Sequence, residues 1–205
     1  MQLVAENVSC ARGGRRILAG LSFAVSGGEA LLVRGRNGAG KTTLLRVLAG
    51  LGAPTAGRVA VAGSDRGVSQ AEQCHFIGHA NAVKAAMTVG ENLRFWGRFL
   101  AGSEAAVPAA LEHFGLADLD EVPAGELSAG QQRRLSLARL LVASRPVWLL
   151  DEPSVSLDAA ALARLLGVIA SHLAGGGLAV IATHVDLAVP NARTLRLDTA
   201  SGLAA

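Results

Sequence analysis

Residues 35–43 read GRNGAGKTT, a glycine-rich run that ends in a lysine and two threonines. The run follows the strand-like stretch EALLV and precedes an apolar-periodic segment typical of a helix. Glycines at this spacing let backbone N–H groups surround phosphate oxygens, and the lysine adds a mobile positive charge. A glycine-rich turn without a ligand is the alternative, which the flanking elements disfavour. The pattern predicts a phosphate-binding loop formed by Gly35, Arg36, Asn37, Gly38, Ala39, Gly40, Lys41, Thr42 and Thr43.

Residues 147–153, VWLLDEP, place two carboxylates at the end of a short apolar strand. Ligands of open parallel sheets bind at the carboxyl ends of the strands. We therefore expect Asp151, through water, and the Thr42 hydroxyl to hold Mg²⁺. Glu152 is expected to orient or deprotonate the water that attacks the γ-phosphate of a bound triphosphate. A solvated Asp-Glu turn is the alternative for this segment alone, but the phosphate loop favours the catalytic interpretation.

Residues 127–135, LSAGQQRRL, have a Ser followed three places later by a Gln at the head of an apolar-periodic run. This spacing predicts a helix that begins with a reciprocal cap between Ser128 and Gln131. Helix N-termini attract anions, yet the loop at 35–43 already accounts for one triphosphate. If two copies pack head to tail, Ser128 and Gly130 of one copy reach the γ-phosphate held by Lys41 of the other. An ordinary capped helix is the alternative for this motif alone.

The composition is that of one domain covering residues 1–205. Apolar residues make up 51% of the chain, but charges or glycines interrupt every apolar run, so no membrane-spanning segment is expected. The first ten residues lack the pattern of a signal peptide. The net charge is +3, but the arginines are scattered, and we expect no nucleic-acid partner. Cys10 and Cys74 lie far apart and predict reduced thiols rather than a disulfide framework.

The order of elements predicts an α/β fold. Strand and helix patterns alternate at both ends of the chain, which favours a parallel sheet with helices on its faces. A mostly helical insert from roughly 80 to 140 interrupts this alternation. Strands are expected near residues 2–8, 21–25, 29–34, 74–78, 147–150 and 178–183, with a further short strand after the turn at LGAPTAG. Helices are expected near residues 41–50, 128–143 and 159–174. Within the insert, helix breaks are expected at Gly102, at Pro108 and between Gly115 and Gly125.

Five segments, GRNGAGKTT, LSAGQQRR, LLDEP, SLD and ATH, occur in the order and approximate spacing of an ABC-transporter ATPase cassette, which the chain resembles over nearly its whole length. The resemblance implies a P-loop NTPase fold with a parallel core sheet, an antiparallel β subdomain and a helical subdomain that meets a membrane partner. It also implies that Asp158 lies in a loop contacting the opposite subunit. His184 would contact the γ-phosphate and hold Glu152 and the attacking water in place.

Two positions depart from the pattern of that family. The chain has no Tyr, and the region CARGGRRIL places Arg12 where an aromatic residue usually stacks on adenine. A guanidinium can stack as a flat cation, so Arg12 is a candidate for base binding. His79 occupies the place of the usual Gln that touches Mg²⁺ and is carried over as a candidate metal contact, although imidazole suits Mg²⁺ poorly.

A narrower resemblance rests on GHANAVKAAMTVGENLRFW, RPVWLLDEP and THVDLAVPNARTLRL. These segments look like those of the cytochrome c biogenesis ATP-binding export family, also called haem exporter ATPases. The resemblance implies an ATPase that dimerises on binding ATP, joins membrane subunits at the cytoplasmic face of the bacterial inner membrane, and powers haem export or release of a haem-loaded chaperone. The ATPase of another exporter, and a soluble ABC ATPase acting on ribosomes or DNA, are the alternatives.

Direct haem binding is not expected, because strand alternation sends Cys74 and His75 to opposite faces. Phe95, Trp96 and Phe99 cluster in the helical insert. They are candidates for a groove that receives the membrane partner, with Trp96 the better surface candidate. The alternative is that Phe95 and Phe99 face the core of the insert itself.

Overall fold

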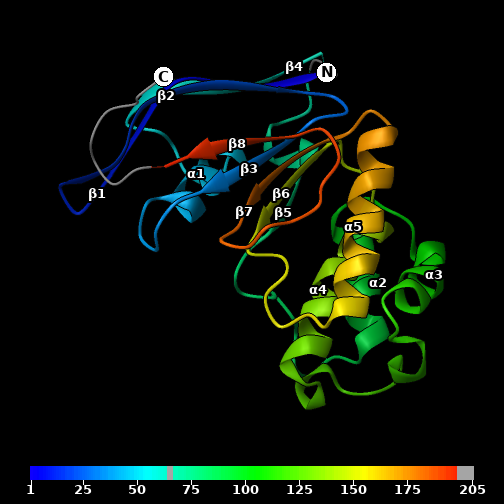
Figure 1. Ribbon diagram of the computed structural model, residues 1–205. Coiled ribbons are helices and arrows are strands. Elements are labelled where there is room, and N and C mark those ends of the chain that lie inside the picture. The colour runs from blue at the N-terminus through cyan, green and yellow to red at the C-terminus, as the bar shows by residue number, and fades with distance from the viewer. Residues whose placement is uncertain (64–66, 198–205) are drawn as a thin grey trace. The chain divides into compact units, whose positions relative to one another are not determined.

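The computed structural model describes residues 1–63 and 67–197, and the chain forms two compact units (Figure 1). The first unit contains residues 1–76 and 146–152 and the chain from residue 169 onward. The second contains residues 77–145 and 153–168. The expected helical insert thus falls within the second unit, which also includes a stretch after Glu152.

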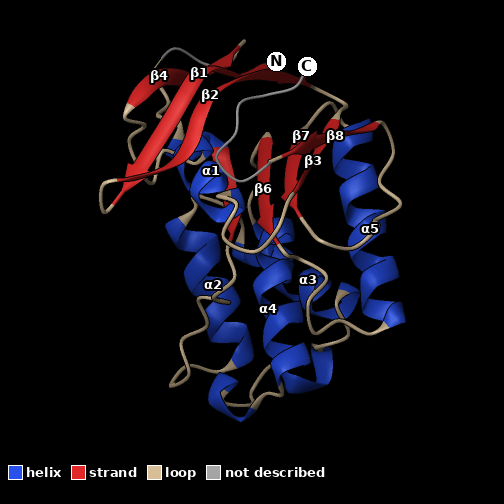
Figure 2. Cartoon of the chain, turned by 60° about the vertical axis from the view of Figure 1, so that its left-hand side comes forward, coloured by secondary structure: helices blue, strands red, loops and turns tan. Residues whose placement is uncertain are grey.

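An antiparallel sheet in the first unit contains β1 (Gln2–Arg12), β2 (Arg15–Ser26) and β4 (Ala56–Ala62) in the order β2-β1-β4 (Figure 2). β1 and β2 are longer than the strands expected at 2–8 and 21–25. Arg12 pairs with Arg15, so Gly13 and Gly14 form a two-residue turn with φ of 56° and 73°. Positive φ at both positions suits the twist of a hairpin, and glycine adopts it without strain.

The main sheet has the order β5-β6-β7-β3-β8, with β5 (Cys74–Ile77), β6 (Val147–Asp151), β7 (Leu178–Ala182), β3 (Ala30–Arg34) and β8 (Ala192–Arg196). β3 pairs in parallel with β7 and β8, and β6 pairs in parallel with β7. All residues of β6 and β7 are buried, which explains their uninterrupted apolar sequences. β8 was not predicted: its sequence ARTLR is mostly exposed and shows neither an apolar run nor alternation.

Helix α1 (Lys41–Leu48) packs its apolar face into the core of the first unit. Leu44, Leu45 and Leu48 are fully buried there with Leu149 of β6 and Val180 of β7. Because α1 directly follows β3, this packing fixes the connecting segment over the end of the sheet.

The second unit is helical. It contains α2 (Val89–Phe99), α3 (Val107–His113), α4 (Ala129–Val142) and the first part of α5 (Ala159–Ala174), joined in part by short 3₁₀ turns. α4 contacts both α2 and α3. α2 begins with a capping box between Thr88 and Glu91. Pro108 was expected to break a helix, but it lies in the first turn of α3, where its missing N–H costs no hydrogen bond.

In the described residues, no helix combines the length and apolar character needed to cross a membrane. Many apolar side chains are buried in the hydrophobic cores of the two units. Leu135, Leu137 and Leu140 of α4 are buried in the second unit, as are Leu111 of α3 and Phe114, which directly follows that helix.

His172 of α5 is stacked on Trp148 of β6 in the first unit, with ring centroids 3.9 Å apart. Its Nε2 lies 3.2 Å from the carbonyl oxygen of Leu178. Burial lowers the pKa of His172 below its ordinary value of 6.5. The unfolded chain therefore takes up a proton at a higher pH than the folded chain does. The stability from the neutral ring is present above pH 6.5 and is lost as the pH falls below it.

We predict that His172→Phe reduces the fall in the free energy of unfolding as the pH is lowered, because phenylalanine retains a stacking ring but cannot be protonated. Urea unfolding at about pH 7.5 and about pH 5.5 measures the difference. His113→Phe, which removes an exposed histidine of the second unit, serves as the control for loss of a histidine. An equal loss of stability in wild type and His172→Phe would contradict the assignment.

Candidate active site

The segment from Gly35 to Gly40 connects β3 to α1 and leaves the start of α1 open. Gly40 is the N-cap residue with φ of 100°, and no side chain caps the helix. The N–H groups of the first helical turn have no partners within the helix. A Cβ at Gly40 would lie 2.8 Å from Leu18 Cδ2 and 2.9 Å from Ile17 Cγ2. Close packing and positive φ therefore both require glycine here, and the helix start is available to an anion.

Lys41 places its ammonium over this loop. The side chain is buried, and Nζ donates a hydrogen bond of 2.9 Å to the carbonyl oxygen of Gly35. Nζ also lies 3.8 Å from Glu152 Oε1. The structure thus brings the lysine of the predicted loop to the end of β6.

Thr42 and Asp151, the two predicted oxygen ligands of a metal, lie together in the first unit. Thr42 Oγ1 donates a hydrogen bond of 2.7 Å to Asp151 Oδ2, and Asp151 is only 2% exposed. A hydroxyl and a carboxylate are hard oxygen donors of the kind Mg²⁺ prefers. The donor chemistry fits Mg²⁺ that is shared with a phosphate. Among the described residues, no cluster of three His, Cys, Asp or Glu side chains is placed to hold a metal ion.

Glu152 and His184 form a pair beside the loop. Glu152 follows β6 and His184 follows β7, and register pairs Asp151 with Ala182 at the ends of these strands. His184 Nδ1 donates to Glu152 Oε2 over 2.8 Å, and the backbone N–H of His184 donates to the same oxygen over 3.3 Å. Glu152 has φ of 48°, an uncommon conformation for a side-chain-bearing residue. The ring and the backbone N–H of His184 together orient the Glu152 carboxylate.

The predicted cap of α4 is present in the second unit. Ser128 Oγ accepts from the N–H of Gln131 over 3.3 Å, and Gln131 Oε1 accepts from the N–H of Ser128 over 2.8 Å. Ser128 is exposed. A Cβ at Gly130 would lie 2.9 Å from the carbonyl oxygen of Ser156, so the SVSLD loop passes close to the first turn of α4.

The other predicted residues have separate places. Asp158 Oδ1 accepts from the N–H of Ala161 over 2.7 Å and caps α5, so its role in a subunit contact stays a prediction. His79 is exposed in the segment that follows β5. The side chain of Arg12 lies outside the described part of the structure. Cys74 Sγ lies 3.8 Å from the carbonyl oxygen of Leu48, whereas His75 meets Trp148 edge-on.

The sequence interpretation gave no role to Arg133 of α4. The structure shows it 3% exposed and hydrogen-bonded to several oxygens of the second unit. Neighbouring arginines at 133 and 134 look equivalent in the sequence, and only tertiary packing separates them.

The fold and the loop after β3 define a P-loop nucleotide-binding protein of the α/β class. A family model described as "ABC transporter" matches residues 18–155. The chain is 49% identical to a cytochrome c biogenesis ATP-binding export protein of Rhodopseudomonas palustris, with 98% of this chain and 100% of the relative covered. It is also 49% identical to the protein of that description in Bradyrhizobium diazoefficiens, covering 96% and 98% of the two chains. The structure of a bacterial Atm1-family ABC exporter with ATP bound matches with a TM-score of 0.82 at 27% identity, over 98% of this chain and 38% of that one. The chain therefore belongs to the ABC transporter family, in the group of cytochrome c biogenesis ATP-binding export proteins, which confirms the resemblance drawn from its motifs.

We predict that Lys41→Ala lowers the affinity for ATP at least about tenfold, because the loop loses its charge-assisted contact with the phosphates. Equilibrium binding of a fluorescent ATP analogue measures this. Lys84→Ala is the matched control: Lys84 is the other lysine of the chain and lies over the Phe95 ring in the second unit. Equal affinities in Lys41→Ala and Lys84→Ala would contradict the role of Lys41.

Proposed function

We propose that the protein is the ATP-hydrolysing subunit of a membrane exporter in cytochrome c biogenesis, and that it hydrolyses ATP as a head-to-tail pair of chains. Haem export, or release of a haem-loaded carrier, is the work that we assign to the whole complex. The observation that carries the proposal is the convergence of Lys41, Thr42, Asp151, Glu152 and His184 in one unit of the chain. Named relatives of nearly the same length support the biological setting.

The loop from Gly35 to Thr43 binds the triphosphate in this proposal, with the first turn of α1 supplying N–H groups and Lys41 supplying charge. Thr42 and Asp151 would hold Mg²⁺, which would supply positive charge to offset the negative charge of the phosphates. The Lys41 ammonium exchanges the Gly35 carbonyl oxygen for phosphate oxygens.

Glu152 orients and accepts a proton from the attacking water. Its Oε2 accepts a hydrogen bond from His184, and its Oε1 lies 3.8 Å from Lys41 Nζ, so the carboxylate is held beside the lysine that binds the phosphates. The ring of His184, 58% exposed on its side chain, is accessible to the γ-phosphate. His79 is proposed as an additional contact near the metal, and Arg12 as the residue that stacks on adenine.

The second helix start supports the head-to-tail pair. The start of α1 is already assigned to the triphosphate of its own chain. The exposed N-terminus of α4 is therefore available to contact the triphosphate that a second chain holds. Ser128, Gly130 and Gln131 of one chain then close the site over the γ-phosphate held by its twin. Asp158 follows two residues after Ser156, whose carbonyl oxygen lies close to Gly130, and we assign Asp158 to the same contact.

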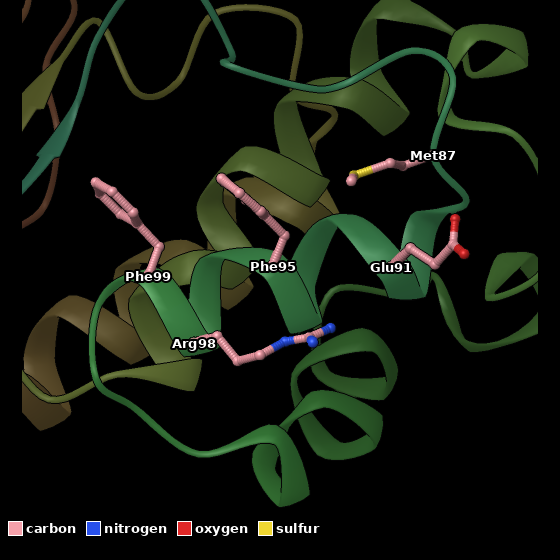
Figure 3. A pocket seen from close by; sticks show the side chains of 5 residues that line it. All are labelled: Met87, Glu91, Phe95, Arg98 and Phe99. Carbon is pink, nitrogen blue, oxygen red and sulfur yellow. The ribbon is translucent and has the colours of Figure 1, made fainter.

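A surface hollow of about 510 Å³ in the second unit is the proposed contact for the membrane subunits. Met87, Glu91, Phe95, Arg98 and Phe99 line it (Figure 3). Phe95 and Phe99 stack with centroids 6.0 Å apart, and Phe99 is 69% exposed. An exposed aromatic ring stacked on a half-buried one, with flanking charges, is typical of protein interfaces. Docking through this surface would place the chain at the cytoplasmic face of the inner membrane.

Trp96, the expected surface residue, is instead half-buried. The Arg139 guanidinium lies 3.8 Å from the centroid of its ring, and its Nε1 donates to the Ala82 carbonyl oxygen over 3.3 Å. The alternative that Phe95 and Phe99 face the interior of the insert is wrong for Phe99. Trp96 and Phe99 are three residues apart on α2, and their rings meet edge-on with centroids 5.5 Å apart, so Trp96 supports the exposed Phe99 ring from the protein side.

We predict that Phe99→Ala reduces co-purification of the membrane subunits at least about fivefold while the ATPase rate of the isolated protein stays within about twofold of wild type. Leu51→Ala, which removes an exposed apolar side chain of the first unit, is the control. A co-purification yield unchanged by Phe99→Ala would remove the hollow from the proposed interface.

We predict that Glu152→Gln binds ATP but lowers kcat by about 10²-fold or more, because an amide cannot accept the proton of the attacking water. The variant should accumulate as an ATP-bound dimer, measured by size-exclusion chromatography with light scattering. Turnover close to wild type would contradict the role of Glu152, and a monomer at saturating ATP would contradict the head-to-tail pair.

A further inference from the structure

Arg133 connects three parts of the second unit through one buried side chain. Its Nη1 donates to the Gly78 carbonyl oxygen over 2.9 Å and to Asn81 Oδ1 over 3.2 Å. Its Nε donates to the Pro153 carbonyl oxygen over 3.3 Å. The guanidinium thus ties α4 to the segment after β5 and to the turn after β6.

The positions of these oxygens in the chain give the contacts a functional meaning. Gly78 directly precedes His79, and Pro153 directly follows Glu152. Arg133 itself lies in the second turn of α4, the helix that begins at Ser128. Arg133 is therefore hydrogen-bonded to the backbone next to His79 and to the backbone next to Glu152, two proposed site residues. It also lies on α4, the helix that supplies Ser128.

The segment after β5 is held by further side chains of α2 and α4. Arg139 Nη1 lies 3.4 Å from the Asn81 carbonyl oxygen, and the Trp96 ring lies under the same guanidinium. Asn92, 1% exposed, accepts from the N–H of Lys84 over 2.8 Å and donates to the Lys84 carbonyl oxygen over 3.0 Å. This segment is thus fastened to the helical unit along its length, and a shift of α4 would move it.

Burying two arginines close together is costly. Burial and the positive charge of Arg133 lower the pKa of Arg139 to about 10. A planar fork of donors can bond oxygens on separate segments at once, which neither an apolar side chain nor a lysine reproduces. The free-energy cost of burying the two arginines is therefore offset by fixing α4, the segment after β5 and the turn after β6 relative to one another.

We propose that Arg133 is a positioning residue for ATP hydrolysis. It couples the start of α4 to the backbone that directly precedes His79 and to the backbone that directly follows Glu152, so that closure of the paired site sets the positions of these two residues. The inference rests on the proposed function. It assigns Arg133 to the catalytic step and to pairing, and not to the initial binding of ATP by the phosphate loop.

The test compares Arg133→Met and Arg133→Lys with Arg134→Met. Arg134 is the matched control because it lies next in the same helix and also donates to two carbonyl oxygens, Phe114 and Gly115, each over 2.9 Å, but these belong to the end of α3. We expect Arg133→Met to lower kcat about tenfold or more, with KM for ATP and the affinity for a fluorescent ATP analogue within about threefold of wild type. In the Glu152→Gln background it should also weaken ATP-dependent dimerisation.

Arg133→Lys should recover part of kcat, since one cation can still reach one of the oxygens, whereas Arg134→Met should keep wild-type kcat. A wild-type kcat in Arg133→Met would overturn the inference. Equal losses in Arg133→Met and Arg134→Met, matched by equal drops in Tm, would also overturn it by showing a purely structural role. If Arg133→Met does not fold, Arg133→Lys is the deciding variant. A wild-type kcat in Arg133→Lys, together with a lowered kcat in Arg134→Met, would contradict the proposal. Wild-type protein without ATPase activity would instead contradict the proposed function itself.

Discussion

An uncapped helix start beside two carboxylates is the constraint on which the rest of the structure depends. The first turn of α1 and the ammonium of Lys41 are positive, whereas Asp151 and Glu152 at the end of β6 are negative. Parallel pairing of β6 with β7, and of β7 with β3, brings both charges to the same end of the sheet. A triphosphate with Mg²⁺ matches both signs at once, because its oxygens suit the helix start and its metal suits the carboxylate. The buried apolar strands hold this arrangement rigid.

The starts of α1 and α4 differ in a way that supports a site shared between chains. α1 is open and follows a loop whose backbone must approach its ligand closely. α4 carries a complete reciprocal cap, so its first turn is already ordered before any ligand arrives. A preorganised helix start loses little entropy when it closes over a bound phosphate. Arg133 extends this arrangement inward, because it connects the same helix to the backbone beside His79 and Glu152.

The sequence predicted the parts of the fold that depend on local pattern and failed where tertiary contacts decide. The runs VWLL and LAVIA predicted β6 and β7, and S-x-x-Q predicted the cap of α4, because burial on both faces and capping leave direct marks in sequence. Strand β8 was missed, since an exposed strand at the edge of a sheet needs no apolar pattern. Trp96 was the better surface candidate from the sequence but is half-buried, because helical spacing does not reveal that Arg139 covers its ring. The pairing of Thr42 with Asp151 was predictable from the motifs, whereas the bond from Lys41 to Gly35 was not.

Complementation between two defective chains tests the shared site most directly. In a Glu152→Gln background, one chain carries Lys41→Ala and the other carries Ser128→Arg; the measurement is the amount of labelled ATP that co-elutes with a dimer. A head-to-tail pair leaves one of its two sites with both residues intact in the mixed dimer, so the mixture should retain about one ATP per two chains. Neither variant alone should retain ATP in a dimer. No dimer-bound ATP in the mixture, or equal retention by Ser128→Arg alone, would show that each chain encloses its own nucleotide and would contradict the account.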